Sequence, residues 1–194
     1  MKKNVVGLAI ILAFSLSPLA ARAQQNPVTS AVRAAVSEHA KILVAGAEEM
    51  PADKYNYAPT PQQMTFGRMV LHVAQSNGFL CSRISGEKAP MIGHLTEKSP
   101  KGQLIAAMKS SFNFCEQALG KVNDGDLSQQ VQLFGGRMMS KAGAMIHLAN
   151  DLADHYAQEA MYLRLNGHLP PTGEGPLMKR EMMKGHMTGN HGGM

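Results

Sequence analysis

The feature that most constrains this chain is a set of four long stretches in which apolar residues recur at helical spacing. The stretches cover residues 27–50, 65–86, 101–122 and 140–166, and clusters of glycine, proline and polar residues separate them. No alternating strand pattern of useful length is present, so the sequence predicts an all-α fold. Four helices of similar length, each with one apolar stripe, favour a four-helix bundle. The long connections at 87–99 and 123–139 permit a topology other than simple up-and-down.

The first 23 residues have the features of a secretory signal peptide. Lys2 and Lys3 precede an apolar run, and Ala21, Arg22 and Ala23 form a small-x-small cleavage site. We therefore expect residues 1–23 to be removed and residues 24–172 to form the bundle domain of an exported, periplasmic protein. No later stretch is apolar enough to span a membrane.

Charge and cysteine content narrow the range of partners. Removal of the signal peptide changes the balance from 19 basic and 14 acidic residues to 16 and 14, a net charge of +2. This small net charge, together with the absence of basic runs interleaved with aromatic residues, excludes a nucleic-acid partner. A small-molecule substrate is the partner class that is left. A homodimer is an open alternative. Cys81 and Cys115 are either a disulfide, which an exported protein would retain, or two small buried thiols.

The fourth helical stretch carries a polar stripe beside its apolar face. At roughly 100° per residue, one narrow wedge of the helix holds His147, Asp151, His155, Gln158 and Tyr162. Histidine and carboxylate side chains one turn apart can converge on a metal, and helix bundles build such sites in their cores. The alternative is a surface stripe or a satisfied hydrogen-bond network.

A metal at this stripe needs a ligand from another helix, and His72 in the middle of the second stretch is the candidate. It lies on the flank of that stretch's apolar face. From spacing alone, such a site would combine His72 with ligands from the His147, Asp151 and His155 stripe.

Two segments of the chain resemble the DinB-like (YfiT-related) superfamily of metalloenzymes. "HYAQEAMYLRLNGHLPP" is similar to that family's "HYGQ…YLRLNG…PP" ending, and "MPADKYNYAPTPQQMTFGRMVLHVAQSNGFLCSRISG" is similar to its other mark, a helix with a mid-helix histidine. The resemblance spans about residues 28–172. It implies an up-down-down-up four-helix bundle with a divalent metal held by three histidines.

Carried onto this sequence, the family's histidines fall on His72, His155 and, in the middle, Asp151. The aspartate still binds zinc, nickel or manganese through oxygen, but it shifts the site toward harder metals. The alternative is that metal binding has been lost. Against the family pattern, His147 one turn earlier is a substitute ligand or an outer partner. Parallel second and third helices, which the resemblance implies, would bring Cys81 and Cys115 to the same end of the bundle and make a disulfide feasible.

The function that the resemblance implies is metal-dependent hydrolysis or group transfer, because a metal with open positions activates bound water or thiol. Gln158 and Tyr162 would orient a substrate or simply fill the polar side of the bundle. A non-catalytic bundle without metal is one alternative. A second is copper binding by residues 173–194, a segment expected to be disordered. Its thioether and imidazole groups suit copper and include Met182, Met183, His186, Met187 and His191.

Overall fold

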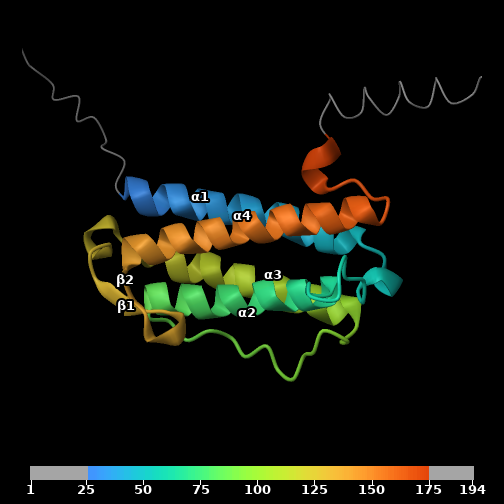
Figure 1. The fold of residues 1–194 in the computed structure, drawn as a ribbon. Helices are drawn as coiled ribbons and strands as arrows, with labels where there is room; N and C mark the ends of the chain where they lie inside the picture. Colours follow the sequence, from blue (N-terminus) through green and yellow to red (C-terminus); the bar gives the residue numbers. More distant parts are fainter. Residues whose placement is uncertain (1–25, 175–194) are drawn as a thin grey trace, which may run out of the picture.

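Four long helices dominate the computed structural model, which describes residues 26–174. They are α1 (Pro27–Glu49), α2 (Phe66–Ser85), α3 (Lys101–Leu119) and α4 (Lys141–Leu165). α1 and α4 run in one direction and α2 and α3 in the other, so the bundle is up-down-down-up (Figure 1). The predicted fold class is confirmed. The predicted signal peptide and all but the first two residues of the predicted tail lie outside the described residues.

Local sequence signals set the helix ends. The Thr65 side chain accepts a hydrogen bond from the Arg68 amide at the start of α2, and the Ser140 hydroxyl accepts one from the Gly143 amide at the start of α4. α2 ends at Gly86, whose φ of 82° is a left-handed conformation that glycine adopts without steric cost.

The connection between α3 and α4 contains structure that the sequence did not predict. A small antiparallel hairpin pairs β1 (Gln130–Gln132) with β2 (Met138–Ser140) across a turn at Gly135 and Gly136, both with positive φ. Its strands are three residues long, too short for an alternating pattern to show. The short elements of the fold are η1 (Ala52–Lys54), η2 (Asp124–Asp126), β1 (Gln130–Gln132), η3 (Phe134–Gly136), β2 (Met138–Ser140) and η4 (Pro171–Glu174).

One apolar core fills the space between the helices. α1 packs against α3 and α4, and α2 packs against the same two helices. The largest fully buried side chains include Leu43, Met69, Leu80, Met108 and Met145, so every helix contributes. Among the described residues, no helix is long and apolar enough to cross a membrane.

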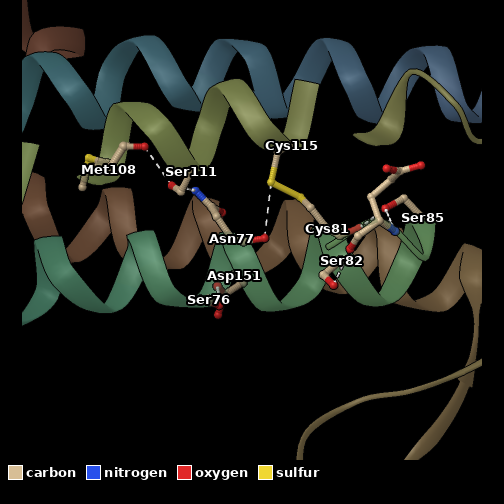
Figure 2. The surroundings of a disulfide bond; sticks show 10 residues. Ser76, Asn77, Cys81, Ser82, Ser85, Met108, Ser111, Cys115 and Asp151 are labelled. Atoms are coloured by element: carbon tan, nitrogen blue, oxygen red, sulfur yellow. Dashed lines mark hydrogen bonds between the residues drawn. A yellow bond between two sulfur atoms is a disulfide. The ribbon is translucent and has the colours of Figure 1, made fainter. Parts of the chain in front are cut away.

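A disulfide joins Cys81 of α2 to Cys115 of α3 (Figure 2). The segment of residues 86–100 returns along the bundle, so α2 and α3 run parallel (Figure 1). Each cysteine lies in the last turns of its helix. Their Cα atoms are 5.2 Å apart, and both side chains are buried. The bond therefore links α2 directly to α3, which the chain itself connects only through the long segment of residues 86–100.

Candidate functional site

Two neighbouring turns of α2 and two of α4 bring four polar side chains together. His72 and Ser76 come from α2, and Asp151 and His155 come from α4. The Ser76 hydroxyl donates to Asp151 Oδ2 at 2.9 Å (Figure 2), and His155 Nε2 lies 3.5 Å from Asp151 Oδ1. The rings of His72 and His155 meet edge to face with their centroids 4.9 Å apart. The three predicted metal ligands are therefore adjacent.

The surroundings of Asp151 favour its ionised form. Burial by itself raises the pKa of this carboxyl, but hydrogen bonds from His155 and Ser76 and the nearby histidines outweigh burial and lower the pKa below its usual value. Asp151 is 21% exposed, whereas His155 is 7% exposed. A charged carboxylate thus sits at the edge of the core.

The two imidazoles differ in what holds them. Burial, followed by the neighbouring His155, lowers the pKa of His72, although Asp151 opposes this change. Nδ1 of His155 is buried and has no hydrogen-bond partner among the described residues. The buried ring is therefore held by polar contacts on one side only.

The donor chemistry of this cluster fits a divalent cation. Metal ligands must be deprotonated, and the cluster offers a low-pKa carboxylate and a histidine that resists protonation. Two imidazoles and one carboxylate suit zinc, nickel or manganese. Within residues 26–174, however, no group of three or more His, Cys, Asp or Glu side chains is arranged as a metal site. The cluster gathers suitable donors without presenting them already converged.

The other predicted site residues lie elsewhere. His147 is exposed one turn before Asp151. The Gln158 amide donates to the carboxylate of Asp154 on the solvent side of α4, at 2.8 Å. Tyr162 is buried, and its hydroxyl donates to the Met64 carbonyl at 2.7 Å. The proposed tail ligands (Met182, Met183, His186, Met187 and His191) lie outside the described residues.

Sequence reasoning missed Glu159, one turn beyond His155. This side chain is fully buried, and neither carboxyl oxygen has a hydrogen-bond partner among the described residues. Its carboxyl lies directly against Gly46 of α1, where an added Cβ would come within 2.5 Å of Oε2. Burial raises the pKa of Glu159 well above its usual value, which favours the neutral acid.

Burial increases along α4 from the surface stripe into the core. At successive one-turn steps His147 is exposed, Asp151 is partly buried, and His155 and Glu159 are buried. The stripe therefore turns from solvent into the bundle, and the histidine–aspartate cluster occupies the point where it crosses the surface.

Comparison with known proteins identifies the architecture. The model of the DinB family matches residues 28–185. A DinB-like protein from Bacillus subtilis is 19% identical with a TM-score of 0.58, covering 71% of this chain and 92% of its own. A DinB-like protein from Bacillus cereus is 16% identical with a TM-score of 0.62, covering 73% and 95%.

The fold is also similar to that of a mycothiol-dependent maleylpyruvate isomerase. The two chains are 12% identical with a TM-score of 0.57, over 77% of this chain and 65% of the isomerase. At these identities the structural matches show the shared fold alone. No curated protein matches the chain.

Proposed function

Because the chain belongs to the DinB family, we propose that it is an exported, divalent-metal-dependent enzyme that hydrolyses a small molecule or transfers a group to it. The observation that carries the proposal is that His72, Asp151 and His155, from two helices, lie next to one another where α4 passes from the surface into the core. These residues would hold the cation, and His147 is the outer alternative.

The protein's own residues have separable tasks in this proposal. Ser76 fixes one oxygen of Asp151 and leaves the other facing His155. The burial of His155 excludes bulk water from one side of the site, while the partial exposure of Asp151 leaves an approach for substrate. A bound divalent cation would supply activation of water or another nucleophile near neutral pH.

The choice of hydrolysis or group transfer rests on the proposed compartment as well as on the site. One protein of similar fold is a mycothiol-dependent isomerase, so the fold accommodates thiol-dependent chemistry in that protein. Low-molecular-weight thiol cofactors belong to the reducing cytoplasm. A chain exported through residues 1–23, with its two cysteines joined, would work outside that compartment.

Metal analysis of tag-free protein tests the proposal. We expect residues 24–194 and a form ending at Glu174 each to bind about one equivalent of zinc, nickel or manganese. His155→Ala and Asp151→Asn should abolish this binding, because each removes one of three ligands. His94→Ala is the control, since it removes an exposed imidazole in the segment between α2 and α3.

The same measurement separates the alternatives. A shorter form that stays empty under titration with all three metals would refute the enzyme proposal and leave a non-catalytic bundle. If only the longer form binds metal, and in particular copper, the metal-binding function would lie in the segment after residue 174.

A further inference from the structure

A pocket of about 340 Å³ lies between α1 and α3. Because α2 and α4 form the opposite pair of the bundle, this groove is on the other side from the histidine–aspartate cluster. Its volume falls within the range of about 300–1,000 Å³ that is common for small-ligand sites. It is a candidate for a second site, independent of the function proposed above.

The pocket has an apolar floor and a polar rim. Val36 from α1 and Phe112 and Leu119 from α3 line it, and all three are buried side chains of the core. Arg33 from α1 and Glu116 from α3 line the same pocket and are exposed. A ligand in this pocket would meet apolar carbon below and one charge of each sign at the rim.

The two rim charges are unpaired among residues 26–174. Neither Arg33 nor Glu116 forms an ion pair or a side-chain hydrogen bond there, with each other or with any other described residue. Other charges on the bundle surface do pair, in Lys41–Glu38, Lys109–Glu48 and Lys121–Glu87. Opposite charges that face one pocket without closing on each other leave room for a ligand between them.

The position of Arg33 is defined by the end of α3. Its Nη2 lies 3.7 Å from the point that a Cβ on Gly120 would occupy, so the guanidinium leans over the C-terminus of that helix. The carbonyl end of a helix favours a nearby cation. Arg33 is thus directed toward the pocket's α3 wall and has donors left to bind a carboxylate.

We propose that this pocket binds a small zwitterion with an apolar side chain, the chemistry of a free apolar α-amino acid. Arg33 takes the carboxylate, Glu116 takes the ammonium group, and the side chain lies against Phe112 on the apolar floor. A ligand with only a negative charge would be repelled by Glu116, and a ligand with only a positive charge would be repelled by Arg33. A ligand that carries both charges can pair with both residues at once.

Three related compounds and two variants of the mature protein test the proposal by titration calorimetry. L-phenylalanine carries both charges, 3-phenylpropanoate lacks the ammonium group, and 2-phenylethylamine lacks the carboxylate. We expect L-phenylalanine to bind and each of the other two to bind at least about tenfold more weakly. Equal binding of the three compounds, or no binding by L-phenylalanine, overturns the proposal.

The variants assign each charge to its residue. Arg33→Gln should weaken L-phenylalanine binding about 10- to 100-fold without weakening 2-phenylethylamine binding, because it removes the charge that repels the amine. Glu116→Gln should cause the same loss for L-phenylalanine without weakening 3-phenylpropanoate binding. Glu38→Gln, an exposed carboxylate of α1 that does not line the pocket, is the control. Both rim side chains are exposed and unbonded, so the variants should unfold at the same temperature as the unmodified protein. A change in the monomer–dimer equilibrium in either variant would instead make this face an interface between copies and overturn the proposal.

Discussion

Replacement of Glu159 by glutamine should remove a specific pH dependence of folding stability. The buried acid has a raised pKa, so the folded protein keeps a proton that the unfolded chain loses above its ordinary pKa of 4.5. When the unfolded state binds fewer protons, stability falls as pH rises. The stability associated with Glu159 is therefore fully present below pH 4.5 and is lost progressively as pH rises toward the folded pKa.

The magnitude follows from the burial and the missing partners. One proton of difference changes the free energy of unfolding by about 1.4 kcal/mol per pH unit. A buried polar group without a hydrogen bond costs about 1–3 kcal/mol, and more if charged. We expect Glu159→Gln to lie close to the parent near pH 4.5 and to be up to about 3.5 kcal/mol more stable at pH 7, which is this slope taken over 2.5 pH units. For a chain of this size, the full difference is roughly 7–14 °C in Tm. Glu159→Met, which has no polar atoms, should be more stable across the whole range.

Urea unfolding followed by circular dichroism from pH 4.5 to 8, with the disulfide intact, measures this difference. Asp151 contributes with the opposite sign, because its net pKa is lowered and its stabilisation is lost as pH falls. Subtracting the two proteins' profiles cancels that contribution. Parallel profiles for Glu159→Gln and the parent would refute the reasoning, since Glu159 would then titrate as it does in the unfolded chain.

Three further changes test the packing. Gly46→Ala should destabilise the protein by about 1–3 kcal/mol, because its Cβ would overlap the Glu159 carboxyl; in a Glu159→Ala background this cost should largely disappear, and an unchanged cost would contradict the contact. The paired Cys81→Ala and Cys115→Ala variant should lose about 3–4 kcal/mol in urea unfolding, the loop-closure value for a separation of 34 residues; a loss below 1 kcal/mol would show that the bond does not restrict the unfolded chain as that model assumes. Tyr55→Phe removes a buried 2.6 Å hydrogen bond to an α1 carbonyl and should lower Tm by roughly 2–6 °C, whereas an unchanged Tm would mean that water replaces it.

The helices could be predicted from the sequence because each is long enough for its apolar period to show. The four helices begin within one residue of the expected stretches and end within three. The hairpin of β1 and β2 could not, because strands of three residues carry too little alternation and pair through the backbone. The apolar periodicity also does not show in which direction each helix runs relative to the others. The family resemblance implied it, and the bundle-spanning segment of residues 86–100 makes it possible (Figure 1).

The histidine–aspartate cluster was predictable in part, because one-turn spacing places Asp151 and His155 on one side of α4. Spacing within one helix says nothing about which residues of another helix face it. Ser76 therefore went unnoticed, although it donates the shortest hydrogen bond to Asp151. Its signal was its position one turn after His72, on the same side of α2.

Glu159 could have been found from the sequence by following the angle of the stripe. Each four-residue step advances about 40° around a helix, so a row that begins at exposed His147 has turned by about 120° when it reaches Glu159. At that angle the neighbouring side chains are Leu148 and Leu152, which are both buried. A glutamate in the middle of an apolar arc needs a small residue opposite it, and Gly46 is the only glycine of α1. The pairing of an acid with that glycine shows that the bundle reserves space for a carboxyl in its core. The stability and pH dependence of Glu159 therefore report on the inner end of the row that carries the candidate site.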